Sequence, residues 1–355
     1  MRHTALPAIL AILASLALAV PCRAAEPGPL ARAVIAEAAG RLNDQLGAVA
    51  QSAKALGAAY AALYRDAQAL APGERARFLE SYAVKDGTVA FRAPASACGP
   101  DPQAQAPCQA LYFYNGENFT DETFRALSAM TRLAPAMAAA HDALPFSWVY
   151  LTTPGQNFCI YPYLPLSEAV NNAQPTDKGF YTAADFEKKA CGWESPYLDL
   201  AGAGMMVTVA CPVYDGDTLL GVASRDVTLA QLSKNVLADL AAIPGAKAVV
   251  MNRRGKAIAA SDPNIADFIV KENTKAGDAV VYFRADRGLA ALGQKKNLES
   301  PDKAVNDAAE TVLERAESER KWPIAFTRGK ETVLAARLGE TGWYLMLVLP
   351  QKVAR

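Results

Sequence analysis

This sequence has very little histidine, and neither basic nor acidic residues are in excess. The 355 residues contain only His3 and His141, which excludes His-rich metal sites and mechanisms that need two imidazole groups. Lysine and arginine number 36 and so do aspartate and glutamate, so no basic excess indicates a nucleic-acid partner. After the first 24 residues, no apolar run reaches the roughly 18 residues that a membrane-spanning helix needs. Hydrophobic residues make up 52% of the chain, which is ample for folded cores.

The N-terminus has the pattern of a secretory signal peptide. A short basic segment precedes an apolar stretch over residues 5–20, which is too short to span a bilayer comfortably. The small side chains of Cys22 and Ala24 favour cleavage between Ala24 and Ala25. A lipoprotein anchored at Cys22 is the alternative, and Pro21 disfavours it. We therefore expect a periplasmic or secreted protein.

The remaining cysteines agree with export. Cys98, Cys108, Cys159, Cys191 and Cys211 remain after cleavage, and an oxidising compartment would pair all but one of them. Cys98 and Cys108 bracket a proline-rich loop that a disulfide would hold together. For the second pair we favour Cys159 with Cys191, which leaves Cys211 as a buried free thiol within an apolar run. No base is evident beside Cys211, so a catalytic role is not expected.

Periodicity predicts mixed helix and sheet in the first two thirds of the chain. Apolar residues recur at intervals of three, four or seven over residues 29–70, which predicts one long amphipathic helix. The clearest hairpin joins strands at 205–214 and 218–226 through a turn at 215–217. Further helices are expected over 74–82, 120–140 and 182–190, and further strands over 88–92, 110–114, 147–153 and 158–163.

The last third repeats the pattern on a smaller scale. After a linking helix over 229–242, Pro244 and Gly245 mark a domain boundary. Ser300 and Pro301 have the features of an N-cap and first position for a helix over 302–320. Strands are expected over 246–252, 256–261, 279–284, 324–327, 331–338 and 343–349. The fold class is therefore α+β: a long N-terminal helix and then two domains, each an antiparallel sheet flanked by helices.

Three short motifs resemble double Cache (dCache) sensor domains. Residues 178–181, KGFY, resemble the family's Arg-Pro-Trp-Tyr element. Residues 193–199, WESPYLD, resemble its Trp-x-x-x-Tyr-x-Asp element, and residues 221–226, GVASRD, resemble its Gly-Val-x-x-x-Asp strand end. Most family members sit between two transmembrane helices of receptors or kinases, and this sequence is similar to a freestanding periplasmic form.

The resemblance implies a domain organisation. We expect the signal peptide at residues 1–24 and the long helix with its short successor at residues 25–82. A membrane-distal-type Cache domain, which would bind the ligand, is expected at 83–243 with the linking helix, and a membrane-proximal-type Cache domain at 244–355. Both would be PAS-like.

The resemblance also implies a ligand site. In amino-acid-binding members, the arginine and tryptophan before the first tyrosine hold the ligand carboxylate, and the later tyrosine and two aspartates hold its amino group. Tyr181, Tyr197, Asp199 and Asp226 match this pattern. Lys178 and Phe180 replace the arginine and the tryptophan. Lysine lacks a bidentate fork and phenylalanine lacks an indole donor, so an amine without the usual acid end is as compatible as an amino acid.

The residues support a cation site without the resemblance. Asp199 and Asp226 end segments that we expect to pair in one sheet, and two carboxylates attract an ammonium group. Aromatic rings cluster around the same sheet and can wall a pocket or cage a cation; they are Tyr150, Tyr161, Tyr163, Phe180, Tyr181 and Tyr197.

Two functions remain open at this point. One is a periplasmic protein that binds an amine-bearing small molecule and presents its bound state to a membrane-bound receptor, kinase or transporter. The other is a ligand-free Cache scaffold that acts as a protein-interaction subunit, for example through the helix at 29–70. The resemblance also admits a homodimer through that helix. No enzymatic activity, cofactor, metal or nucleic acid is expected, because two carboxylates without a nucleophile or a metal cluster are typical of a cation site.

Overall fold

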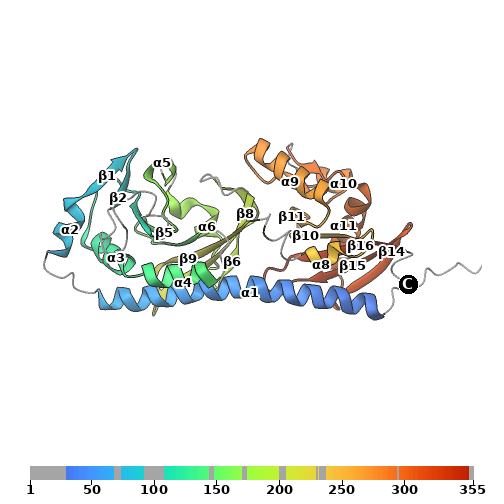
Figure 1. Cartoon of the computed structure of the whole chain (residues 1–355), viewed down its shortest axis with the longest axis horizontal. Coiled ribbons are helices and arrows are strands. Elements are labelled where there is room, and N and C mark those ends of the chain that lie inside the picture. The colour runs from blue at the N-terminus through green and yellow to red at the C-terminus, as the bar shows by residue number, and fades with distance from the viewer. Residues whose placement is uncertain are drawn as a thin grey trace, which may run out of the picture.

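The computed structural model describes residues 29–67, 73–91, 108–143, 148–169, 174–199, 205–228, 231, 237–293 and 296–351. The expected signal peptide and Cys98 lie outside these residues. Two lobes lie next to each other along one long helix (Figure 1). The first lobe is built on a nine-stranded sheet and the second on a five-stranded sheet. This architecture confirms the predicted fold class.

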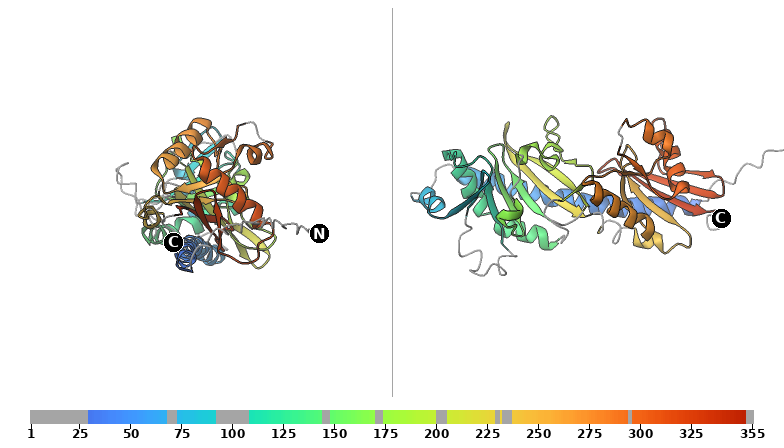
Figure 2. Two further views of the ribbon diagram at one scale, coloured as in Figure 1. Left: turned by 90° about the vertical axis from the view of Figure 1, so that its right-hand side faces the viewer. Right: turned by 90° about the horizontal axis from the view of Figure 1, so that it is seen from above.

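Helix α1 (Pro29–Asp66) is the 38-residue element that both lobes share. Its apolar stripe is buried along its whole length, from Ile35 through Leu42 and Leu46 to Leu56, all at most 2% exposed. The stripe is continuous because the spacing of three and four residues keeps these side chains on one face. Figure 2 shows the helix running beneath both sheets. Among the described residues, no helix combines the length and apolarity needed to cross a membrane.

The sheet of the first lobe has the strand order β1-β2-β3-β5-β4-β9-β8-β6, with β7 also paired to β8. Its central hairpin, β8 and β9, is the one that the turn at 215–217 predicts. All neighbouring strands are antiparallel. The strands are β1 Tyr82–Lys85, β2 Thr88–Phe91, β3 Ala110–Phe113, β4 Val149–Thr152, β5 Asn157–Tyr161, β6 Gly192–Trp193, β7 Tyr197–Leu198, β8 Met205–Asp215 and β9 Thr218–Thr228.

Side chains alternate between the two faces of this sheet. On one face, Leu151 of β4 and Cys159 of β5 pack in a core that includes residues of α1 and of helices α3 (Asp121–Thr131) and α4 (Ala134–Ala143). On the other face, Tyr150 and Phe158 form a separate cluster with Ile160. This second face carries the candidate site.

Two helices expected in the first lobe differ from the prediction. The expected helix over 120–140 is divided into α3 and α4, because Pro135 has no amide hydrogen for the helical bond to Thr131. The helix expected over 182–190 is wrong: there Asp185 and Ala190 form a bridge across a tight turn. The other helices of this lobe are short: α2 Glu74–Glu80, α5 Leu166–Ala169, the 3-10 helix η2 Pro175–Asp177 and α6 Gly179–Thr182.

The second lobe has the strand order β11-β10-β16-β15-β14. These strands are β10 Lys247–Met251, β11 Ala257–Ala260, β14 Ile324–Arg328, β15 Glu331–Arg337 and β16 Tyr344–Pro350. A parallel pair, β12 Val281–Tyr282 and β13 Leu298–Glu299, lies apart from this sheet. The helices are α8 Ala238–Ala241, α9 Pro263–Ala276, α10 Asp286–Ala290 and α11 Lys303–Ala316.

Helix caps explain two further differences in the second lobe. Helix α9 was not expected, although Asp262 caps it and Gly277 ends it in a left-handed conformation with φ 67°. Helix α11 begins at residue 303, one residue later than predicted. Its N-cap is Asp302 rather than Ser300, because the side chain of Asp302 accepts the hydrogen bond from Val305 N.

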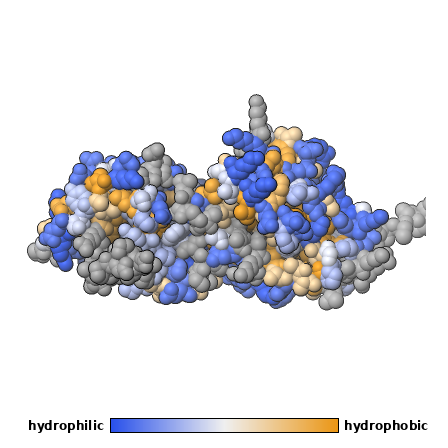
Figure 3. All heavy atoms as spheres, turned by 45° about the horizontal axis from the view of Figure 1, so that its top comes forward, coloured by the Kyte–Doolittle hydropathy of each residue, from blue (hydrophilic) through white to orange (hydrophobic). Residues whose placement is uncertain are grey.

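One hydrophobic core joins the lobes. It contains Val207 of β8 in the first lobe, Leu334 and Leu345 in the second, and the first half of the α1 stripe. The rings of Trp193 and Trp343 meet edge to face at the same junction, with centroids 5.6 Å apart. On the face shown in Figure 3 the two lobes form separate bulges, and hydrophilic residues cover much of the second.

The disulfide in the described residues differs from the predicted one. Cys191 is bonded to Cys211, and Cys159 is a buried free thiol whose pKa is raised by burial. The prediction of Cys159 with Cys191 is wrong because β6 pairs with β8, which brings Cys191 beside Cys211. Cys159 instead faces Met137. The predicted Cys98–Cys108 pair stays a prediction, since Cys98 lies outside the described residues.

Candidate functional site

A cavity of about 330 Å³ lies in the first lobe between the sheet and the segment 174–199. Aromatic and aliphatic side chains form most of its wall, and carboxylates stand at its floor and side. The lining residues are Tyr114, Trp148, Tyr150, Phe158, Ile160, Leu164, Glu168, Ala169, Lys178, Gly179, Phe180, Glu194, Tyr197, Leu198, Asp199 and Asp226. Six of the nine residues predicted from the sequence are among them: Lys178, Phe180, Tyr197, Asp199, Asp226 and Tyr150.

Asp226 is fixed at the floor of the cavity by the antiparallel sheet. It lies on β9 opposite Thr208 of β8, and its backbone amide donates to Trp148 O, 3.1 Å away, at the start of β4. Its side chain is 2% exposed. Because residues two apart share a face, Asp226 and Ser224 point to the same side of the sheet, while Arg225 points to the other. There Arg225 donates to the carbonyl of Ala140 at 2.7 Å.

Three hydroxyl groups surround one oxygen of Asp226. Tyr150 donates to Oδ1 at 2.8 Å, and Thr208 donates to the same atom at 2.5 Å. Tyr197 lies 3.4 Å from Oδ1 and 2.8 Å from Thr208 Oγ1. No described residue donates to the second oxygen, Oδ2. The carboxyl group is therefore rigidly held through one oxygen, while its other oxygen is left for a donor from elsewhere.

Burial makes ionisation of Asp226 costly in the empty cavity. Desolvation raises its pKa to about 7, although the hydrogen bonds from Thr208 and Tyr150 act in the opposite direction. The nearby charge of Asp199 raises it further. A cation bound beside Oδ2 would remove this cost, because an opposite charge at close range stabilises the carboxylate.

Asp199 extends the anionic floor toward the side of the cavity. It follows β7, which pairs with the edge of β8, and Trp148 Nε1 lies 3.5 Å from its Oδ2. Asp199 is partly exposed, in contrast to Asp226. Asp199 and Asp226, both named from the sequence, therefore line one cavity.

Glu194 is a third carboxylate in this cavity that the sequence reading missed. Desolvation raises its pKa to about 8, the charge of Asp226 adds to the rise, and Lys178 opposes it. Its Oε2 is buried and has no hydrogen-bond partner among the described residues. Gly179 packs directly against it, since a Cβ at that glycine would lie 1.8 Å from Glu194 Oε1. Glutamate side chains are rarely buried without a partner.

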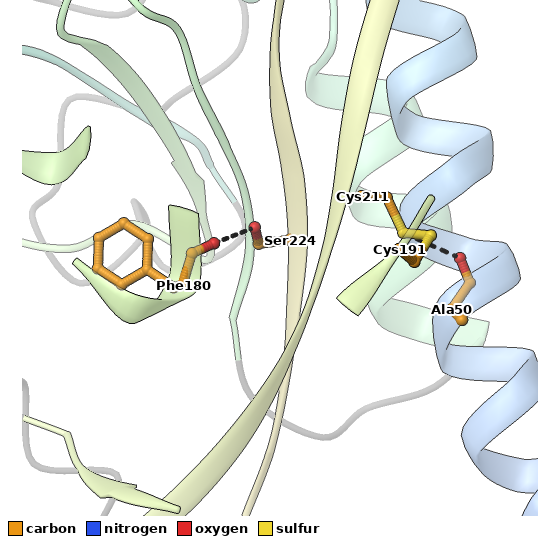
Figure 4. The surroundings of a disulfide bond; sticks show 5 residues. All are labelled: Ala50, Phe180, Cys191, Cys211 and Ser224. Carbon is orange, nitrogen blue, oxygen red and sulfur yellow. Dashed lines mark hydrogen bonds between the residues drawn. A yellow bond between two sulfur atoms is a disulfide. The ribbon is translucent and has the colours of Figure 1, made fainter. Parts of the chain in front are cut away.

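Aromatic rings form the apolar wall. The ring of Tyr150 lies 5.5 Å from that of Phe158 and 5.3 Å, edge to face, from that of Phe180. Phe180 is held in place by its backbone, because its carbonyl accepts a hydrogen bond from Ser224 Oγ at 3.0 Å (Figure 4). Electron-rich ring faces next to carboxylates suit a ligand that has a cationic end and an apolar body.

The disulfide anchors the segment that closes the cavity. Cys191 precedes β6, and its bond to Cys211 ties this segment to β8 on the α1 side of the sheet (Figure 4). Cys211 Sγ lies 3.8 Å from Ala50 O of α1. Phe180 lies on the opposite side of the same strands. The disulfide therefore fixes the cavity wall from behind without entering the cavity.

Three predicted ligand residues lie outside the cavity lining. Tyr161 is on the opposite face of β5, where its ring packs against His141 at 5.3 Å, because it shares the parity of Cys159 rather than of Ile160. Tyr181 packs on Phe186 at 5.5 Å, in a small cluster with Ala210 and Val222. Tyr163 packs at the margin of the cluster around Tyr150.

Other lining residues could be found only once strand pairing is known. Trp148, Phe158 and Ile160 share a face with Tyr150 by strand alternation and cross-strand register. Glu194 lies between Trp193 and Tyr197 of the second motif, at a position where the motif specifies no residue type. Tyr114 ends an expected strand, but nothing in the sequence indicates that it lines the cavity. Leu164 and Glu168 come from a segment for which no element is expected.

The polar groups of the lining are carboxylates, one lysine and the polar atoms of aromatic side chains. Among the described residues that line the cavity there is no serine, threonine, cysteine or histidine to act as nucleophile or neutral base. Within the described part of the chain, no three His, Cys, Asp or Glu side chains are placed so that they could hold a metal ion. Carboxylates beside aromatic rings suit an organic cation.

Comparisons with known proteins give similar structures but no matching family. A scan against models of protein families finds no match, and a search of curated proteins finds none. Among solved structures, the ligand-binding domain of the Pseudomonas aeruginosa PAO1 amino acid chemoreceptor PctC, in complex with GABA, is 19% identical. The match covers 57% of this chain and 74% of that chain, with a TM-score of 0.36.

Two more ligand-binding domains are similar. That of the Pseudomonas fluorescens chemoreceptor CtaA, in complex with L-isoleucine, is 18% identical over 62% of this chain and 77% of that chain, with a TM-score of 0.38. That of Mlp24, with asparagine, is 14% identical over 64% and 85%, with a TM-score of 0.33. All three structures are ligand-binding domains, and those of PctC and CtaA belong to chemoreceptors. At these identities and TM-scores, the ligand of this chain has to be inferred from its own cavity.

Proposed function

We propose that this protein is an exported sensor-type binding protein that captures a small amine-bearing molecule in the cavity of its first lobe. The observation that supports this most is Asp226, a buried carboxylate held through Oδ1 by Tyr150 and Thr208 and without a described donor at Oδ2. An ammonium group would donate to Oδ2 and to Asp199 while it packs against the aromatic wall.

The energetics of Asp226 support a cationic ligand. A carboxyl group with a pKa of about 7 is half protonated near neutral pH, so the empty cavity is not stabilised by its charge. A bound ammonium would supply the missing counter-charge, and each charge-assisted hydrogen bond contributes roughly 1.5–3 kcal/mol. The same buried carboxylate would repel an anionic ligand. The polarity of the floor therefore selects for positive charge.

The acid end of an amino acid is less well supported. Lys178 lines the cavity and can supply one positive charge, while Phe180 offers a ring face without a donor. Glu194 is close enough to Lys178 for their charges to interact, which reduces the attraction of Lys178 for a ligand carboxylate. We therefore place simple amines beside amino acids as ligands of this cavity.

Export and a membrane partner complete the proposal. The N-terminal sequence pattern and the Cys191–Cys211 disulfide are both typical of a protein in an oxidising compartment outside the cytoplasm. In such a compartment, a binding protein of this kind would present its bound form to a receptor, kinase or transporter in the membrane.

A thermal-shift screen of the protein with residues 1–24 removed tests the proposal. Amino acids, primary amines, quaternary amines and carboxylic acids should each be tested on the wild type and on Asp226→Asn. The control is Asp185→Asn, a change outside the cavity. A ligand at 100 times its Kd stabilises the fold by about 2.7 kcal/mol. We expect stabilisation by an amine or amino acid that Asp226→Asn abolishes and Asp185→Asn preserves. Absence of any stabilisation, or stabilisation indifferent to Asp226, would favour the ligand-free interaction scaffold.

A further inference from the structure

The cavity contains more carboxyl groups than a single ammonium group requires. Four carboxylates line it, Glu168, Glu194, Asp199 and Asp226, against one basic residue among the described lining, Lys178. Asp226 lies on β9, whereas Glu194 and Asp199 belong to the segment 174–199 that closes the cavity, Glu194 directly after β6 and Asp199 directly after β7. Carboxyl groups from the sheet and from the closing segment thus face one cavity of about 330 Å³.

We propose that the ligand carries two cationic groups, one bound at Asp226 and Asp199 and the other at Glu194. This inference rests on the proposed function, because it assigns a ligand class to the same cavity. Glu194 is then the residue that distinguishes a dication from a simple amine.

The geometry of Glu194 supports this assignment. It immediately follows β6, and its backbone amide donates to Thr208 O at 2.8 Å, so the main chain at this position is fixed to β8. Its Oε2 is buried without a hydrogen-bond partner among the described residues. Gly179 lets the chain pass directly over the carboxyl group, where any side chain would displace it. Oε2 of this carboxyl group is thus enclosed by the cavity wall and has no donor among the residues that the structure describes.

Lys178 does not satisfy Glu194 within the described structure. Both line the cavity, yet no ion pair within 4.0 Å joins them, and the lysine only moderates the rise in the pKa of Glu194 that burial causes. Near neutral pH the glutamic acid therefore keeps its proton in the empty cavity. When a second ligand cation binds, Glu194 loses that proton to the buffer and the cation takes its place as the counter-charge.

The wall between the two anionic positions suits the body of such a ligand. Tyr150 and Tyr197 are close enough to both Asp226 and Glu194 for the charges of these groups to affect the tyrosines. The ring of Phe180 packs on Tyr150 beside them. A short methylene chain can lie against these rings while its two ends reach the two carboxylates.

Calorimetric titration with matched amines tests the proposal. Putrescine and cadaverine should be compared with butylamine and pentylamine, which have the same chain lengths and one ammonium group. We expect the diamines to bind wild type at least about tenfold more tightly than the monoamines, as one charge-assisted hydrogen bond implies. The variant Glu194→Gln should lose this preference, so that the diamines bind it no more tightly than the monoamines of equal length. Glu187→Gln, an exposed glutamate of the same segment, should change neither.

Proton release gives a second readout that needs no variant. Titrations in buffers of different ionisation enthalpy count the protons released per ligand, and near pH 7 a diamine should release more of them than a monoamine of equal length. Lysine and ornithine, tested beside the diamines, show whether the dication also bears a carboxylate. If the dication bears a carboxylate, Lys178→Met should weaken binding of lysine and ornithine. The same variant should strengthen binding of the diamines.

The outcomes separate this inference from the proposed function. The dication proposal would be overturned if diamines and monoamines bound with equal affinity and equal proton release, and if Glu194→Gln had no effect. In that case, monoamine binding that depends on Asp226 would still support the proposed function. Binding of neither class would overturn both. A preference for diamines that persists in Glu194→Gln would show that another group reads the second cation, which also contradicts the inference.

Discussion

The indole rings of Trp193 and Trp343 meet edge to face across the junction of the two lobes, with centroids 5.6 Å apart. Trp193 ends β6 and is followed directly by Glu194, which lines the cavity, whereas Trp343 precedes β16 of the second lobe. Both rings pack in the core that α1 shares with both lobes. The residue directly before Glu194 is therefore in contact with the second lobe.

We expect this pair to couple the lobes energetically. In a double-mutant cycle with Trp193→Leu and Trp343→Leu, the interaction should amount to about 1 kcal/mol, the usual value for an aromatic pair beyond its buried area. Urea unfolding followed by circular dichroism measures it, provided that each variant unfolds in a single transition. Strict additivity of the two substitutions would show that the rings touch without coupling the lobes.

Stability should depend on pH through Asp226. Its carboxyl group ionises near pH 4 in the unfolded chain and near pH 7 in the native cavity, so the native state holds the proton more tightly. The contribution of this group to the free energy of unfolding is then complete below about pH 4 and is lost as the pH rises through 7. The loss is on the order of 4 kcal/mol. Thermal unfolding of the ligand-free protein between pH 4 and 8 measures it.

Asp226→Asn is the matched control for this pH dependence. The amide is nearly isosteric and does not titrate, so the variant should lose about half of the decline in stability between pH 4 and 7. The other half should remain and continue to about pH 8, because the pKa of Glu194 is also raised, to about 8. An identical pH profile in wild type and variant would contradict the burial of an ionisable Asp226.

The disulfide should matter for both stability and ligand binding. Cys191 and Cys211 are 20 residues apart, and closing a loop of about this length contributes roughly 3 kcal/mol. Replacing both by serine should lower the stability by this order and weaken binding, because the segment 174–199 loses its attachment behind the cavity. Chemical unfolding and ligand titration measure the two effects. Loss of stability with unchanged affinity would show that pairing with β8 alone holds the wall.

The free thiol of Cys159 provides an independent check of the cysteine assignment. It is fully buried and its pKa is raised by burial, so little thiolate forms at neutral pH. A thiol reagent should therefore modify it slowly in the native protein and rapidly in denaturant. Mass spectrometry after digestion identifies the labelled peptide. Rapid native labelling at residue 211 instead would revive the pairing of Cys159 with Cys191.

Gly179 should be intolerant of any side chain. A Cβ there would lie 1.8 Å from Glu194 Oε1 and 2.9 Å from its Cγ, so alanine must push the glutamate out of its place. We expect Gly179→Ala to weaken ligand binding by tenfold or more, with a smaller effect on stability because α6 is short. Gly216→Ala, at the exposed turn of the β8–β9 hairpin, is the comparison: it should affect stability through its positive φ and leave binding intact. If Gly179→Ala and Gly216→Ala bound the ligand with equal affinity, Glu194 would not be part of the binding site.

Local signals in the sequence are enough to predict the large elements. The α1 stripe from Ile35 to Leu56 follows helical spacing, and the turn at residues 215–217 predicts the β8–β9 hairpin. Asp226 and Asp199 can be predicted to converge because strand ends in one sheet lie together. Parity along the strands also predicts that Tyr161 faces away from Tyr150, once their pairing register is known.

Features that depend on distant contacts could not be predicted. The choice of Cys211 as partner of Cys191 follows from the pairing of Gly192 with Ala210, which no local pattern reveals. Residues 185–190 have helical propensity, yet hydrogen bonds from Lys188 to the Asp185 side chain favour the turn. Glu194 belongs to the cavity only because β6 is placed at the edge of β8.

A crystal structure with the most stabilising amine bound tests the central claim most directly. We predict an ammonium nitrogen about 2.8 Å from Asp226 Oδ2, with Asp199 near the same nitrogen and the ligand body against Tyr150 and Phe180. Tyr150 and Thr208 should still donate to Oδ1. A ligand that places an acid or neutral group at Asp226, or that binds outside this cavity, would contradict the account.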